Sequence, residues 1–146
     1  MRKIWFDMDG TIADLYGVEN WLEMLVNGDA TPYAIAKGIV NLSLLARLMN
    51  KAQRSGYEIC IVSALAKDST AEYDEEVKTA KIGWLRKHLK SVNFNEIRFV
   101  PYWFVKNGVN TGNDILFDDE ERHLTAWTGE AINANRMIES LKVLTA

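Results

Sequence analysis

Several residue types and patterns are scarce in this sequence. The chain of 146 residues has one cysteine and two prolines. A single cysteine excludes an internal disulfide. No apolar run approaches the roughly 18 residues that a membrane-spanning helix needs. The N-terminus also lacks the apolar stretch of a signal peptide, because Asp7 follows closely on the first basic residues. These absences predict a cytoplasmic protein with no membrane anchor.

Positive charge is not in excess either. The chain has 17 Lys and Arg against 20 Asp and Glu, a net charge of −3. This balance argues against a broad nucleic-acid-binding surface. The composition, 48% hydrophobic and 25% charged, is that of a globular protein and excludes disordered, collagen-like and coiled-coil classes. Since domains typically run to roughly 100–200 residues, we expect a single domain over residues 1–146.

Strand-like and helix-like segments alternate along the chain. Short apolar or β-branched runs predict five strands, at 3–6, 57–62, 97–100, 115–117 and 130–132. Apolar spacing and helix start signals predict helices at 19–25, from 31 onward, and at 41–55, 71–89 and 135–144. This order predicts an α/β fold, a Rossmann-like three-layer sandwich with a mostly parallel five-stranded sheet.

Polar residues follow the expected strands, at the edge where such sheets bind ligands. They are Asp7, Asp9, Ser63, Lys106, Asp118 and Asp119. Carboxylates from two strands can hold Mg²⁺, which prefers oxygen ligands and often completes its shell with phosphate. A hydroxyl and a lysine can hold further phosphate oxygens, and a carboxylate can attack phosphorus. The strand ends therefore indicate chemistry on a phosphate group.

The segment Asp7-Met8-Asp9-Gly10-Thr11 carries the strongest signal. Residues two apart on an extended chain project to the same side, so Asp7 and Asp9 can face one pocket. Gly10 lets the backbone turn away sharply and expose its amides. The spacing therefore favours two carboxylates acting together at the end of a buried strand.

Four segments resemble, in order, the four motifs of the haloacid dehalogenase superfamily of phosphohydrolases. They are Phe6-Asp7-Met8-Asp9-Gly10-Thr11, Ile61-Val62-Ser63, Lys106 and Phe117-Asp118-Asp119. Within this superfamily the chain is most similar to the 5′(3′)-deoxyribonucleotidases. That likeness also includes Ile12-Ala13-Asp14, Lys67 and Lys81-Ile82-Gly83-Trp84. The resemblance covers nearly the whole chain. It implies Mg²⁺-dependent hydrolysis of a small-molecule phosphomonoester, with (deoxy)nucleoside monophosphates as the favoured substrates.

The resemblance also implies catalytic roles. Asp7 would attack phosphorus, while Asp9 would protonate the leaving alkoxide and then activate the hydrolytic water. Mg²⁺ would be held by the Asp7 side chain, the Asp9 carbonyl and one carboxylate of a pair. In that pair Asp119 is the favoured direct ligand, and Asp118 is its neighbour or the partner of a lysine.

Phosphate oxygens would be held by a hydroxyl, by backbone amides and by a lysine. The expected residues are Gly10, Thr11, Ser63, Ala64, Lys106 and Lys81. Two lysines compete for the place between phosphate and Asp7, and Lys106 is favoured over Lys81. Such preorganised charge is usually the largest catalytic effect.

Two positions depart from the nucleotidase pattern. Val62 replaces a threonine that often precedes the serine, and Leu15 replaces an aromatic residue that often lies against the base. Three aromatic residues are candidates to compensate, namely Tyr16, Trp21 and Tyr33. Residues of about 16–37 have the length of a small helical cap inserted after the first strand, which would close over the site and select the leaving group.

Other functions stay open at this point. The same residues would serve a phosphatase for another small metabolite or for a nucleic-acid end, or a phosphotransferase. A binding-only relative is the alternative of another class, since fold does not fix function; the presence of both Asp7 and Asp9 argues against it. Of the other reactive residues, Cys60 is expected in the core and His123 at the surface. The sequence does not indicate an oligomeric state.

Overall fold

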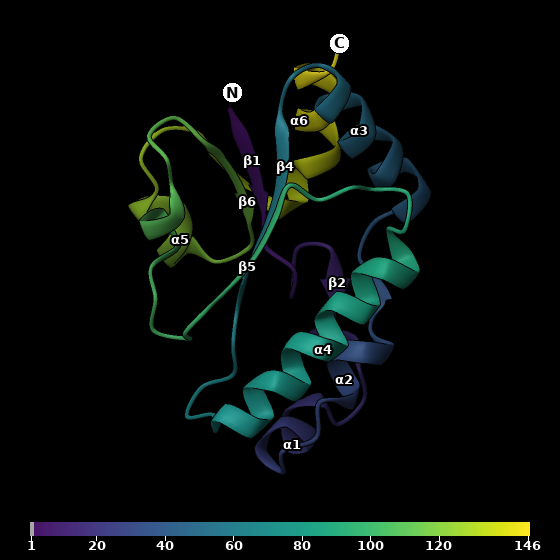
Figure 1. Ribbon diagram of the computed structural model, residues 1–146, viewed down its shortest axis with the longest axis vertical. Coiled ribbons are helices and arrows are strands. Elements are labelled where there is room, and N and C mark those ends of the chain that lie inside the picture. The colour runs from purple at the N-terminus through teal and green to yellow at the C-terminus, as the bar shows by residue number, and fades with distance from the viewer. Residues whose placement is uncertain (1) are drawn as a thin grey trace.

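A computed structural model describes residues 2–146 (Figure 1). Its centre is a five-stranded sheet in the order β5-β4-β1-β6-β7, in which every neighbouring pair is parallel. The strands are β1 (Lys3–Phe6), β4 (Glu58–Ala64), β5 (Glu96–Val100), β6 (Ile115–Asp118) and β7 (Ala131–Asn133). Each expected strand is present within two residues. The predicted fold class is confirmed.

Each strand of the sheet sends alternate side chains to opposite faces. In β1, Ile4 and Phe6 enter one core, whereas Trp5 enters a second core with Cys60 and Leu116. The expected core position of Cys60 is thus confirmed. The first core is covered by α3 (Leu42–Arg54), α4 (Ala71–His88) and α6 (Met137–Leu144). A short helix, η3 (Ala134–Arg136), directly precedes α6. The second is covered by η2 (Lys106–Val109) and α5 (Glu121–Ala126), so α5 and α3 lie on opposite sides of the sheet in Figure 1.

The two longest helices begin at capping side chains. The Asn41 side chain accepts the Leu44 N–H at 3.0 Å, and the Thr70 hydroxyl accepts the Tyr73 N–H at 3.1 Å. Each bond satisfies a backbone donor that the first helical turn leaves free. The sequence places both helices within one or two residues of these bounds. None of the helices in residues 2–146 is long and apolar enough to cross a membrane.

A small helical segment leaves the sheet after β1 and returns before α3. A two-stranded antiparallel pair, β2 (Ala13–Asp14) and β3 (Lys37–Gly38), holds its two ends side by side. Between them lie η1 (Leu15–Gly17), α1 (Trp21–Val26) and α2 (Thr31–Ile35). Tyr33 of α2 packs with Tyr73 and Val77 of α4, and the Tyr73 hydroxyl donates to the Asp29 carbonyl at 3.2 Å. Figure 1 shows α1 and α2 beside α4.

Candidate active site

Strand register brings the polar strand ends together. Phe6 of β1 pairs with Ile61 of β4 on one side and with Phe117 of β6 on the other. Asp7 and Asp118 each follow one residue later, so both start from the same edge of the sheet. The edge is the carboxyl end of parallel strands, where the sequence places the site.

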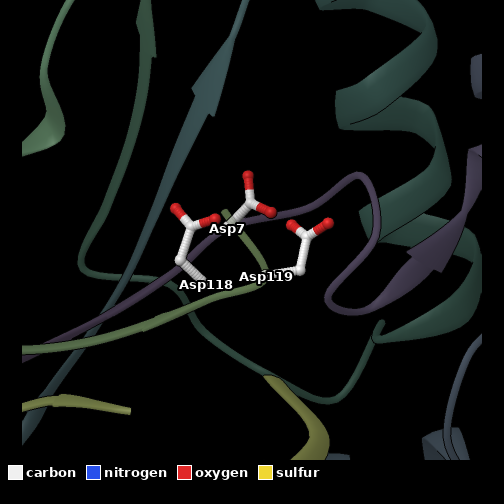
Figure 2. A group of neighbouring side chains, drawn as sticks. All are labelled: Asp7, Asp118 and Asp119. Carbon is white, nitrogen blue, oxygen red and sulfur yellow. The ribbon is translucent and has the colours of Figure 1, made fainter. Parts of the chain in front are cut away.

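Three carboxylates meet at this edge. Ligand oxygens of Asp7, Asp118 and Asp119 all lie within 4.8 Å of one another (Figure 2). Burial and the neighbouring Asp7 raise the pKa of Asp118 to about 6 and that of Asp119 to about 8. Carboxylates crowded in this way repel one another, and a bound divalent cation removes that repulsion. The oxygen donors fit Mg²⁺.

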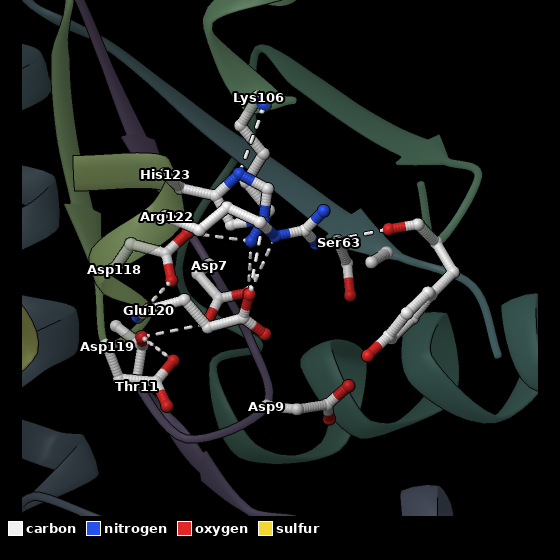
Figure 3. A network of polar contacts seen from close by, with 12 residues as sticks. Asp7, Asp9, Thr11, Ser63, Lys106, Asp118, Asp119, Glu120, Arg122 and His123 are labelled. Carbon is white, nitrogen blue, oxygen red and sulfur yellow. Dashed lines mark hydrogen bonds and ion pairs between the residues drawn. The ribbon is translucent and has the colours of Figure 1, made fainter. Parts of the chain in front are cut away.

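The Lys106 ammonium bridges two of these carboxylates. Its Nζ lies 2.7 Å from Asp7 Oδ1 and 2.7 Å from Asp118 Oδ2 (Figure 3). Burial opposes ionisation of Asp7, but the Lys106 charge holds the pKa of Asp7 below its usual range. Of the two lysines that the sequence leaves in competition, the one in contact with Asp7 is therefore Lys106.

Lys81 occupies a different place. Its side chain is fully buried, and its Nζ lies 2.9 Å from Asp9 Oδ2, 2.7 Å from Ser63 Oγ and 2.8 Å from the Ala64 carbonyl. The Tyr33 ring lies 4.8 Å from the same ammonium. Burial raises the pKa of Asp9 and the Lys81 charge only partly offsets this. Asp7 and Asp9 thus have separate lysine partners and opposite pKa shifts.

The loop after Asp7 is closed by its own hydrogen bonds. The amides of Gly10 and Thr11 donate to carbonyls of the same loop, at 2.9 and 3.1 Å. The Thr11 hydroxyl donates to Asp7 Oδ2 at 2.9 Å. Thr11 therefore contacts the site through its side chain, whereas the sequence suggests its amide. Gly10 has φ +87°, and a Cβ there would collide with the Asp119 carboxylate, so only glycine fits.

His123 is the residue that sequence reasoning missed. The expectation of a surface position is wrong, because the side chain is 1% exposed and its Nδ1 accepts the Lys106 backbone N–H at 3.2 Å. Helix α5 packs on η2 and turns this ring inward. A lone histidine in a polar stretch gives no sequence signal for such a contact.

The aromatic candidates of the inserted segment differ in how exposed their side chains are. Leu15 is buried, and Tyr16 lies half-exposed with its ring edge-on to Trp21 at 4.9 Å. Burial, and then the negative charges of Asp9 and Asp119, raise the pKa of Tyr16. Tyr16 is thus the most exposed of the three aromatic candidates.

The fold is similar to that of other solved structures. No family model matches the chain, and no curated protein matches it. The crystal structure of D,D-heptose 1,7-bisphosphate phosphatase from Burkholderia thailandensis is similar, with a TM-score of 0.53 and 14% sequence identity. The match covers 86% of this chain and 71% of that one. At this identity the likeness shows a shared fold.

Proposed function

We propose that this protein is a Mg²⁺-dependent phosphomonoester hydrolase of the haloacid dehalogenase type. The carboxylate cluster of Asp7, Asp118 and Asp119, bridged by Lys106, is the observation that carries the proposal. The fold shared with a heptose bisphosphate phosphatase supports it. The order of the four sequence motifs supports it independently.

Asp7 is proposed as the nucleophile. Lys106 keeps its carboxylate ionised, and the Thr11 hydroxyl fixes the second oxygen. Attack on phosphorus forms the acyl phosphate and breaks the bond to the leaving alkoxide. Water then attacks the acyl phosphate, releasing inorganic phosphate and the free Asp7 carboxylate.

Asp9 is proposed as the acid and base of the two steps. Its raised pKa suits a group that must hold a proton before attack and give it to the alkoxide. The same carboxylate then takes a proton from the attacking water. Lys81 holds Asp9 and Ser63 in fixed positions, and Ser63 is proposed to hold a phosphate oxygen.

Asp7 and Asp119 are proposed as side-chain ligands of Mg²⁺, with the Asp9 carbonyl as a third. Bound Mg²⁺ would neutralise charge on the phosphate and on the carboxylates. Asp118 accepts from Lys106 and, through Oδ1, from the Glu120 N–H at 3.0 Å. These bonds favour Asp118 as the partner of the lysine and leave Asp119 as the direct ligand.

The substrate is proposed to be a small phosphorylated molecule. A (deoxy)nucleoside monophosphate is favoured, with the segment of about 16–37 acting as a small cap over the leaving group. Tyr16, which is half-exposed, is the aromatic side chain of this segment available to such a base. A sugar phosphate is the second candidate, because the structural relative is named for a heptose bisphosphate.

Phosphate release from a panel tests the proposal. The panel holds ribo- and deoxyribonucleoside 5′- and 3′-monophosphates, sugar phosphates and an aryl phosphate, each with Mg²⁺. We expect Asp7→Asn to lower the rate by roughly a thousandfold or more while circular dichroism stays unchanged. We also expect chelation of Mg²⁺ to stop turnover. An Asp7→Asn protein near the wild-type rate, or activity after thorough chelation, would overturn the mechanism.

A further inference from the structure

The helix that carries Lys106 begins without a cap of its own. Lys106 is the first residue of η2, and the preceding residue, Val105, is apolar and offers no capping side chain. Backbone donors in a first helical turn have no partner within the helix. The Lys106 side chain is only 3% exposed, so water has little access to this site. The structure supplies the acceptor from another element, namely His123 Nδ1 (Figure 3).

The His123 ring joins the two loops of the site. Its Nδ1 accepts the Lys106 N–H at 3.2 Å, and its Nε2 lies 3.4 Å from Glu120 Oε2. Glu120 directly follows Asp119. An Nδ1 that accepts must lack a proton, so the ring is neutral and carries its proton on Nε2. Burial, then the charges of Lys106 and Arg122, lower the pKa of His123 to about 4, in agreement with a neutral ring.

We propose that His123 is a positioning residue for Lys106. By accepting the Lys106 N–H it fixes the backbone from which the ammonium reaches both Asp7 and Asp118. A lysine side chain is long and flexible, so its two contacts at 2.7 Å depend on a fixed starting point. The catalytic consequence rests on the proposed function, whereas the contact itself does not.

Nuclear magnetic resonance tests the contact without any activity. The chain has two histidines, His88 and His123, so imidazole nitrogen spectra are simple to assign. We expect the Nε2–H tautomer for His123 and a scalar coupling between its Nδ1 and the Lys106 amide nitrogen. A proton on Nδ1, or no coupling, would overturn the proposal.

Paired substitutions test the consequence. His123→Asn keeps an acceptor near the Nδ1 position, while His123→Gln places its amide near Nε2 and His123→Leu has no acceptor. We expect the Leu and Gln variants to lose roughly ten- to hundredfold in kcat/KM, mainly in kcat. We expect Asn to stay within about threefold of wild type, since it restores the acceptor. The Asn and Gln pair carries the test if the Leu variant does not fold.

A double-mutant cycle separates positioning from a general structural effect. In a Lys106→Met background the loss from His123→Leu is expected to vanish, because its target is already gone. If turnover in the Lys106→Met background is too slow to measure, the affinity of each variant for inorganic phosphate in the presence of Mg²⁺ is compared in place of kcat/KM. His88→Leu is the matched control. The His88 ring lies tilted against the Trp84 ring, with 4.5 Å between their centroids, at the end of α4. An equal loss in both backgrounds would overturn the proposal.

The proposed function and the positioning role fail in different ways. No phosphate release by wild type on the whole panel would refute the hydrolase, and the spectra would still report the contact. A wild-type hydrolase whose His123→Leu and His123→Gln variants both fold and keep full kcat/KM would refute the positioning role alone.

Discussion

Lys106 Nζ lies 2.7 Å from Asp7 Oδ1, and both side chains are less than 10% exposed. The same ammonium contacts the fully buried Asp118. One positive charge therefore compensates two carboxylates that water does not solvate. Removal of one partner from a buried ion pair is far more costly than loss of a surface pair, because an uncompensated charge stays behind.

Lys106→Met is expected to lower the free energy of unfolding by roughly 3–5 kcal/mol without Mg²⁺. Mg²⁺ is expected to restore part of this loss, since it would bind the Asp7 carboxylate that the lysine no longer compensates. Urea titrations with and without Mg²⁺ measure both effects. Lys3→Met is the control: Lys3 pairs with Glu96 at 3.2 Å while partly exposed, and its loss should cost about 1 kcal/mol or less. Equal costs for the two variants would contradict this account.

Asp119→Asn is expected to abolish the stabilisation by Mg²⁺ without destabilising the metal-free protein. The raised pKa of Asp119, about 8, reports burial and repulsion by Asp7, both of which the neutral amide relieves. Wild type should gain about 2.7 kcal/mol at a Mg²⁺ concentration of 100 times Kd. Thermal melts with and without Mg²⁺ read this out. Glu121→Gln changes an exposed neighbour and should keep the full gain in stability with Mg²⁺. If Asp119→Asn also kept this gain, Asp119 would not be a ligand of the metal.

Lys81→Met is expected to move the acid limb of the pH–rate profile to higher pH. Lys81 is the positive charge closest to Asp9, so its loss raises the Asp9 pKa further. The carboxylate form that is proposed to activate water then appears only at higher pH. Lys78→Met, a partly exposed lysine of the same helix that pairs with Glu75, should leave the profile in place. An unshifted acid limb in Lys81→Met would separate Lys81 from the ionisation of Asp9.

Stability is expected to fall between pH 6.5 and 4 through His123. The unfolded imidazole takes its proton near pH 6.5, whereas the folded one does so only near pH 4. The unfolded state therefore binds more protons in this window, and unfolding becomes easier as the pH falls. From pH 7 to 5, wild type should lose roughly 1–2 kcal/mol more than His123→Asn. Equal pH dependence of the two proteins would contradict a buried neutral ring.

The sequence predicts the sheet well because its strands are short apolar runs with clear boundaries. Once the strands are parallel, Phe6 and Phe117 must end at one edge, so the meeting of Asp7 and Asp118 follows from topology. The glycine of the Asp-x-Asp-Gly-Thr segment also has a local physical reason. Gly10 has φ +87°, and the Asp119 carboxylate leaves no room for a Cβ there.

The sequence does not show that Lys106 contacts Asp7 and that Lys81 contacts Asp9. Lys81 lies mid-helix and Lys106 follows a loop, so nothing local decides which one reaches Asp7. The choice depends on how α4 and η2 pack on the sheet. His123 is hidden for the same reason, because its contact with Lys106 joins two short helices that no periodicity relates.

The pairing of β2 with β3 has a consequence for how this chain can change over time. Ala13 lies opposite Gly38 and Asp14 lies opposite Lys37, so the two ends of the segment between these strands lie side by side. Insertions or deletions there need not disturb the register of β1 or the start of α3, because the two ends remain adjacent. Selection can therefore remodel residues 15–36 while the carboxylates and both lysines stay in place.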